Sequence, residues 1–120
     1  MGRRSRRAGR LAGAPVAEGR DYTDPEGNIL SLRGSLTAGS RRAYAEALGA
    51  NLLSIEDARQ RAFELLFERL AVRWVIAGVG SESQKELLGR LRIASPAERE
   101  WVRATLRRHC AELFPDVQAP

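Results

Sequence analysis

The sequence has one cysteine, Cys110, and one histidine, His109, in 120 residues. A single cysteine excludes an intrachain disulfide framework and a zinc site built on several thiolates. A single histidine leaves few ways to build a histidine-dependent triad or metal site. We therefore expect no catalytic residues, no bound metal and no cofactor, and the chain is not predicted to be an enzyme.

Long apolar runs and phosphate-binding motifs are missing as well. The most apolar stretch ends at Gly78 and is interrupted by Arg69 and Arg73, so it falls short of the ~20 apolar residues that a membrane-spanning helix needs. No P-loop, dinucleotide fingerprint, serine-hydrolase elbow or zinc-protease motif is present. The mass of 13.3 kDa and the hydrophobic fraction of 43% fit one domain with a packed core.

Lysine is nearly absent, and the positive charge is unevenly placed. Residues 1–20 hold six arginines and one glutamate, whereas residues 21–120 hold 14 basic and 14 acidic side chains. The formal net charge of +5 therefore belongs to the first twenty residues. Because this stretch is rich in glycine and arginine and poor in large apolar residues, we predict a disordered arm over residues 1–19. A single helical domain is expected over residues 20–117.

The arm supports one functional alternative. A nucleic-acid-associated module would use the arm to contact phosphates with a salt-dependent, sequence-independent affinity. The arm has no aromatic residue to stack on bases, which argues against readout of single strands. A solvated tail without a ligand is the other interpretation. The residues that would contact phosphates are Arg3, Arg4, Arg6, Arg7 and Arg10.

Residues 20–33 have the pattern of a short β-hairpin. Asp24, Pro25 and Gly27 occupy the first, second and fourth positions that these residue types favour in a type I turn. Leu30 and Leu32 then alternate with other residues, which is the period of a strand. A lone hairpin is marginal in water, so its leucine face is expected to pack on helices.

Four helices are predicted after the hairpin. Ser40 and Ser54 are candidate N-caps, Ser83 opens a capping box, and Ser95 opens another with proline at the first helical position. The predicted helices cover residues 41–48, 55 to about 77, 84 to about 93, and 96 to the residue before Pro115. The expected fold class is α+β and predominantly α, with the N-terminal hairpin packed on these helices.

The long predicted helix carries the expected partner site. Its apolar residues exceed one stripe, and a helix that is apolar on several sides is buried on several faces or covers a partner. Phe67, Val75 and Ile76 are predicted to face a second chain. Trp74 is expected to anchor the core, with exposure at a partner groove as the alternative.

The remaining polar candidates favour structural roles. Glu64 and Glu68 share a helical face and are expected to form surface ion pairs with neighbouring arginines. His109 and Cys110 are adjacent, so their side chains diverge on a helix and cannot form a relay with each other; we expect a boundary histidine and a buried thiol. The oxygens of Asp24, Glu26 and Asn28 are too few for a calcium loop. Trp101 is expected to be a core anchor.

Residues 21–77 resemble small tail assembly chaperones of long-tailed phages of actinobacteria. The resemblance rests on the hairpin ending in Leu32-Arg33, on Ser35-Leu-Thr-Ala-Gly39, and on a helix closing with Arg69, Leu70, Val72 and Trp74. It implies a helical, non-enzymatic protein that binds the tape-measure protein while the tail tube polymerises, in the cytoplasm of a bacterial host. The arginine arm is not part of this pattern, and the last two helices match no pattern that we can name.

A non-catalytic interaction protein is therefore the leading interpretation, most concretely a phage tail assembly chaperone or a related virion-assembly factor. The expected partner is a helical client of tape-measure type or a second copy of the chain, and no membrane is involved. A nucleic-acid-associated module is the alternative, and an enzyme with a hidden site is the third reading.

Overall fold

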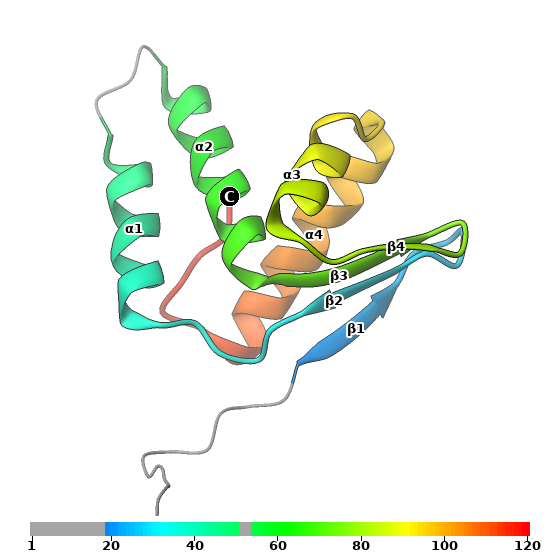
Figure 1. The fold of residues 1–120 in the computed structure, drawn as a ribbon. Helices are drawn as coiled ribbons and strands as arrows, with labels where there is room; N and C mark the ends of the chain where they lie inside the picture. The colour runs from blue at the N-terminus through cyan, green and yellow to red at the C-terminus, as the bar shows by residue number, and fades with distance from the viewer. Residues whose placement is uncertain (1–18, 51–53) are drawn as a thin grey trace, which may run out of the picture.

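The computed structural model describes residues 19–50 and 54–120, so the predicted arm lies almost wholly outside the described residues. The described chain forms a four-stranded antiparallel sheet in the order β1-β2-β3-β4, with helices inserted between β2 and β3 and following β4 (Figure 1). The elements are β1 (Arg20–Thr23), β2 (Ile29–Leu32), α1 (Ala38–Leu48), α2 (Ile55–Leu70), β3 (Ala71–Ile76), β4 (Val79–Ser81), α3 (Gln84–Arg92) and α4 (Pro96–Leu113).

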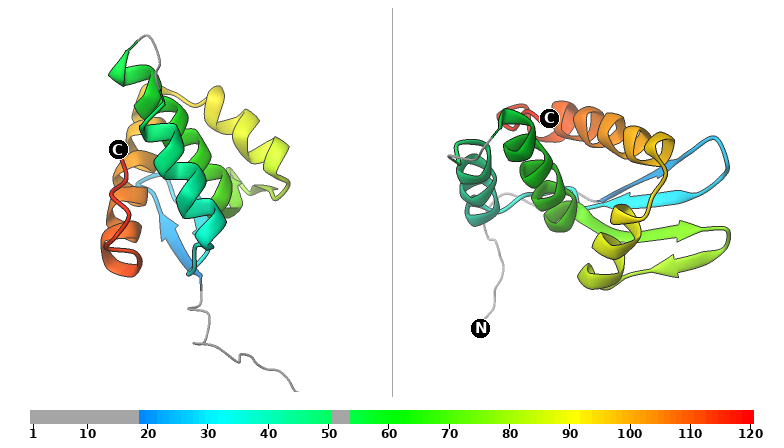
Figure 2. Two further views of the ribbon diagram at one scale, coloured as in Figure 1. Left: turned by 90° about the vertical axis from the view of Figure 1, so that its left-hand side faces the viewer. Right: turned by 90° about the horizontal axis from the view of Figure 1, so that it is seen from above.

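The molecule has two layers. All helices of the described chain lie on one side of the sheet, with α4 running beside β1 and β2 and α3 over β3 (Figure 2). α1 and α2 form an antiparallel pair beside the sheet. The other face of the sheet is covered by no described helix, so the fold presents an open sheet face.

The first hairpin confirms its prediction. β1 pairs with β2 in a register that places Tyr22 opposite Leu30. Asp24 Oδ1 accepts hydrogen bonds from the main-chain N–H groups of Glu26 and Asn28, each at 2.9 Å. Gly27 adopts φ 86°, a conformation that glycine reaches without the steric cost of a Cβ. The turn is therefore stabilised by the Asp24 side chain as well as by backbone pairing.

The helix starts are set by serine and threonine caps. Ser83 and Ser95 each form the predicted capping box, with Glu86 and Glu98 returning the hydrogen bond. α1 begins at Ala38, earlier than predicted, because Thr37 rather than Ser40 is its N-cap. The Thr37 side chain accepts the N–H of Ser40 at 3.0 Å, so Ser40 lies in the first turn.

The long helix is shorter than predicted, and this corrects the sequence interpretation. α2 ends at Leu70, and the chain continues directly into β3. β3 contains a bulge: Leu32 pairs with Ala71 and Ser31 with Arg73, so Val72 is an extra residue on β3. Because of the bulge, Ala71 and Trp74 both face the core although they are three residues apart. Two buried residues three positions apart also fit the period of a helix, which is why the sequence predicted a helix here.

The turn after β3 is a second hairpin that the sequence analysis did not predict. Ala77 has φ 51° and Gly78 has φ 80°, so both central residues of this two-residue loop are left-handed, as a type I′ turn requires. Gly78, expected to stop a helix, instead completes this turn. The left-handed conformation is costly for alanine, since its Cβ crowds the following carbonyl.

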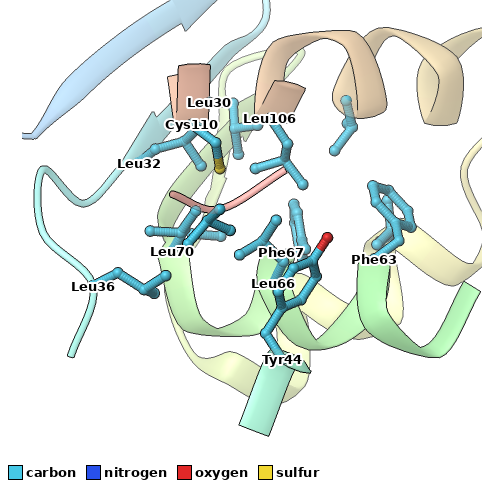
Figure 3. Close-up of a cluster of buried hydrophobic side chains, with 14 of the residues drawn as sticks. Leu30, Leu32, Leu36, Tyr44, Phe63, Leu66, Phe67, Leu70, Leu106 and Cys110 are labelled. Atoms are coloured by element: carbon cyan, nitrogen blue, oxygen red, sulfur yellow. The ribbon is translucent and has the colours of Figure 1, made fainter. Parts of the chain in front are cut away.

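One continuous core joins the sheet to the helices (Figure 3). Phe67 is 0% exposed and Trp74 is 2% exposed. Their rings meet edge to face with centroids 5.8 Å apart. Trp74 is therefore a core anchor as expected, but the prediction that Phe67 lies on an outer face is wrong. Phe67 is enclosed because α2 packs against α1 and α3 and continues directly into β3, which carries Trp74.

We expect Phe67→Ser to lower the free energy of unfolding by about 3 kcal/mol or more, because it removes a buried ring and leaves a polar group in the cavity. Chemical denaturation measures this change. Ile55→Ser on the same helix is the matched control, since Ile55 is 73% exposed, and a surface change of this kind stays within about 0.5 kcal/mol. Equal effects of the two substitutions would contradict the burial of Phe67.

We expect Ala77→Gly to raise the free energy of unfolding by about 1 kcal/mol, because glycine adopts a left-handed conformation without the Cβ clash. Thermal and chemical denaturation measure it. The reverse control is Gly78→Ala: a Cβ there would meet no atom within 4 Å, so its destabilisation would report backbone strain alone. A destabilised Ala77→Gly variant would contradict the turn geometry.

Candidate interaction surface on the open face of the sheet

The structure separates the four residues predicted to bind a partner. Phe67 and Trp74 lie in the core and cannot contact a partner in this fold. Ile76 is half-buried and packs against the core at the end of the second hairpin. Val75 lies in register with Ile29 of β2, away from the helices. Only Val75 of the predicted set therefore lies on the open face.

Two rows of side chains cross the open face. The first row contains Asp21, Ser31 and Arg73, which are aligned in register across three strands. The Ser31 hydroxyl donates to Asp21 Oδ1 at 2.6 Å. The second row is more apolar and contains Thr23, Ile29, Val75 and Gly80. The open face thus combines a polar row with a short apolar one.

The bulge adds an apolar corner to this face. Val72, the extra residue of β3, is 41% exposed. It borders a shallow hollow of about 430 Å³ whose other walls include Ser31, Gly34 and Ser35. A bulge commonly redirects a side chain in this way at the edge of a functional surface. Val72, Ile29 and Val75 together form what we call the open-face patch.

His109 has a structural role on the opposite side of the sheet. It is 0% exposed, and so does not lie at the boundary as expected. Its Nδ1 lies 2.7 Å from the Tyr22 hydroxyl, and its Nε2 lies 2.7 Å from the Arg33 carbonyl oxygen. Since that carbonyl can only accept, Nε2–H donates to it and Nδ1 accepts from Tyr22. The ring therefore ties α4 to β1 and to the residue that follows β2.

The other groups capable of chemistry are buried in the same way. Burial raises the pKa of the Cys110 thiol to about 11 and that of the Tyr44 hydroxyl to about 12. The Tyr44 hydroxyl donates to the Gln118 carbonyl. A thiol with a raised pKa is a weak nucleophile because little thiolate forms near neutral pH. Cys110 is the buried thiol that the sequence predicted.

Of the two α2 glutamates expected to form ion pairs, Glu64 does so, and Glu68 has no ion pair or side-chain hydrogen bond with another described residue. Glu64 forms an ion pair with Arg92 of α3 at 3.0 Å, rather than with the arginines near it on α2. Arg69 donates to the Ser40 hydroxyl at 3.1 Å. Within residues 19–50 and 54–120, no group of three or more histidine, cysteine or acidic residues could hold a metal ion.

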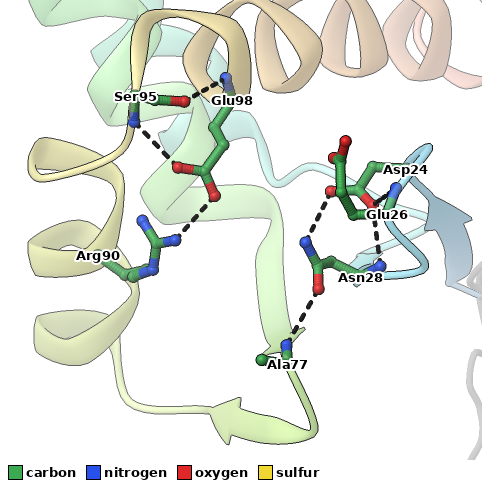
Figure 4. Close-up of polar contacts among 7 residues, drawn as sticks. All are labelled: Asp24, Glu26, Asn28, Ala77, Arg90, Ser95 and Glu98. Carbon is green, nitrogen blue, oxygen red and sulfur yellow. Dashed lines mark hydrogen bonds and ion pairs between the residues drawn. The ribbon is translucent and has the colours of Figure 1, made fainter.

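Two polar clusters join neighbouring elements, one at the tips of the two hairpins and one at the α3–α4 junction (Figure 4). Asn28 bridges the two hairpin tips, because its side chain donates to Asp24 and accepts the N–H of Ala77 at 3.0 Å. At the α3–α4 junction, Glu98 accepts from the N–H of Ser95 at 3.0 Å and pairs with Arg90 at 2.8 Å. These contacts lower the pKa of Glu98, with the backbone hydrogen bond as the largest cause.

In comparisons with known proteins, no family model, no curated protein and no solved structure matches this chain. In the described part of the chain, no helix has the length and apolar character needed to cross a membrane.

The sequence analysis missed Ile29, Val72 and Tyr22 as surface or linking residues. The sequence does contain a signal for β3: Val72, Val75 and Ile76 are β-branched residues, which favour strands over helices. No sequence signal could pair Tyr22 with His109, because they are 87 residues apart and only the fold brings them together.

We expect the stability of the protein to fall as the pH drops below about 6.5, the ordinary pKa of histidine. Burial lowers the pKa of His109 in the folded state. The unfolded state therefore binds more protons in this window, and the free energy of unfolding decreases as pH falls through it. Denaturation between pH 7 and about pH 5 measures the loss.

His109→Gln is the control for this pH dependence, because glutamine can accept from Tyr22 and donate to Arg33 without titrating. The variant should lose the part of the pH dependence that His109 causes. An identical pH dependence in both proteins would show that His109 does not produce it.

Proposed function

We propose that this chain is a non-catalytic interaction protein, most concretely a phage tail assembly chaperone or a related virion-assembly factor. The observation that carries the proposal is the open sheet face with its open-face patch of Ile29, Val72 and Val75. An apolar patch rimmed by polar residues is typical of a surface that binds another protein.

The residues that carry the resemblance to phage tail assembly chaperones lie close together, which supports the same proposal. The segment ending in Leu32-Arg33 and the segment from Arg69 to Trp74 carry the resemblance, and they are neighbours in space. Arg33 N–H donates to the Leu70 carbonyl at 2.8 Å, and Leu32 pairs with Ala71. The resembling residues thus form the joint between α2, β2 and β3, which is where a shared fold would need them.

The buried chemistry favours binding over catalysis. His109, Cys110 and Tyr44 lie in the core, and the hydrogen bonds of His109 and Tyr44 tie elements together. The proposed partner is an apolar helical client of tape-measure type, in the cytoplasm of a bacterial host. A second copy of the chain on the same patch is the other occupant to be tested.

The nucleic-acid alternative depends on the arm alone. Residues 21–120 carry equal numbers of basic and acidic side chains, so the body supplies no net attraction to phosphates. Arg3, Arg4, Arg6, Arg7 and Arg10 lie outside the described residues. The described residues therefore favour the protein-binding proposal.

The proposal predicts that Val72→Lys and Val75→Lys abolish client binding while the domain stays folded. The test is co-expression with an apolar helical segment of a phage tape-measure protein, with the soluble fraction of the segment as readout. Charge on the patch should prevent apolar contact, so the segment should return to the insoluble fraction.

Val79→Lys is the matched control, since Val79 is an exposed valine of β4 outside the patch. It should keep the segment soluble. A wild-type chain that never raises the soluble fraction would contradict the proposal, and equal loss in all three variants would remove the patch from it. Sedimentation of the chain alone tests self-association as the other occupant.

A further inference from the structure

The outer edge of β1 has free main-chain groups. β1 pairs only with β2 in the described sheet, and Asp24 N–H donates to the Asn28 carbonyl at 2.9 Å. Hydrogen-bonded pairs alternate along an antiparallel ladder, so Tyr22 bonds inward to Leu30. The N–H and C=O groups of Asp21 and Thr23 consequently point outward, where an added strand could bond to them.

A groove of about 600 Å³ runs along this edge, between β1 and α4. α4 runs antiparallel to β1 there: Arg20 pairs with Glu112 at one end, and Trp101 lies near the turn at the other. The wall formed by α4 is the stripe Trp101, Ala104, Thr105, Arg108 and Glu112. This spacing places the five residues on one face of the helix.

The groove is apolar at one end and basic at the other. Trp101 and Ala104 supply apolar surface. At the other end, Arg20 and Arg108 both pair with the single carboxylate of Glu112, and Arg108 also lies over the Tyr22 ring at 5.8 Å. Asp21, the other acidic residue that lines the groove, accepts a hydrogen bond from Ser31 on the open face of the sheet. The side of the groove that faces α4 therefore has two guanidinium groups for one carboxylate, which is complementary to a further carboxylate.

We propose that this groove binds an extended segment of a partner protein by strand addition to β1, with an apolar residue and an acidic residue two positions apart. In an added antiparallel strand, alternate side chains face α4. The residue opposite Tyr22 meets Trp101 and Ala104, and the residue two positions later, opposite Arg20, meets Arg20 and Arg108. The recognised pattern is therefore apolar-x-acidic, read from the N-terminus of the partner.

The other sheet edge lacks these features. β4 has three residues, and its pairing with β3 directs Val79 and Ser81 inward, so Gly80 alone points its main-chain groups outward. The β1 edge and the open-face patch are different surfaces, so the groove could bind its segment whether or not the patch binds a client.

The test uses the full chain and a capped peptide of sequence Thr-Val-Thr-Glu-Thr. Strand addition should slow amide exchange at Asp21 and Thr23, with little change at Tyr22, whose amide is already bonded within the hairpin. A peptide N-methylated at the first and third threonines, which would face β1, should bind at least tenfold more weakly. N-methylation at valine and glutamate instead should leave the affinity within about twofold.

Substitutions in the groove test the side-chain contacts. Ala104→Gln should weaken binding at least tenfold by filling the groove, whereas Ala45→Gln adds the same side chain at an exposed position of α1 and should change nothing. Arg108→Glu should weaken the glutamate peptide at least tenfold and improve binding of a peptide with lysine in its place. This reversal would assign the acidic position of the partner to Arg108.

Three results would overturn the proposal. One is the absence of binding up to a peptide concentration of about 1 mM. Another is binding with unchanged exchange at Asp21 and Thr23, or with no preference between the two N-methylated peptides. The third is concentration-dependent protection of these two amides in the chain alone, because a second copy would then occupy the edge.

Discussion

The antiparallel pairing of β2 with β3 is the contact on which the rest of the fold depends. It joins two hairpins that would each be marginal alone, and it closes a loop that contains the whole of α1 and α2. The entropic cost of closing a loop grows only slowly with its length, so an inserted helix pair is tolerated. The hydrogen bond from Arg33 N–H to the Leu70 carbonyl extends the pairing to the end of α2. Without this pairing, Leu30 of β2 and Trp74 of β3 would not lie in the same core.

The sequence predicted the elements whose signals are local. The first hairpin, α3 and α4 are encoded by turn residues and capping boxes that act within four residues, and the structure has them where predicted. The sequence did not predict the second hairpin, because a bulge is a property of two paired strands. Ala71 and Trp74 have the spacing of a helix, and only the pairing with β2 shows that Val72 is an extra residue. Phe67, which was predicted to lie on an outer face, is therefore in the core, whereas Val75 of the predicted partner set lies on the open face of the sheet.

The excess of arginine over lysine has a structural use in the body of the protein. Arg103 lies over the Phe63 ring at 4.6 Å, Arg90 over Trp74 at 5.5 Å, and Arg41 over Phe114 at 5.7 Å. Each covers a core aromatic with a planar cation that keeps its own polar partner: Gln60, Glu98 and Asp116, respectively. A lysine offers no planar group for this stacking. The arginines therefore cover the core aromatics at its rim.

A sheet covered on one face only must expose main-chain edges and one row of side chains in every strand pair. This chain limits the exposed apolar area with the polar row of Asp21, Ser31 and Arg73 and with short strands, devices that reduce unspecific strand pairing. Apolar surface then remains where these devices end, at the bulge of Val72 and in the second row beside it. The helical layer also places the β1 edge next to α4 rather than in open solvent. A strand added to this edge would therefore contact side chains of α4 as well as the main chain of β1. The two proposed binding surfaces thus lie at the two places where the helical layer and the polar row stop.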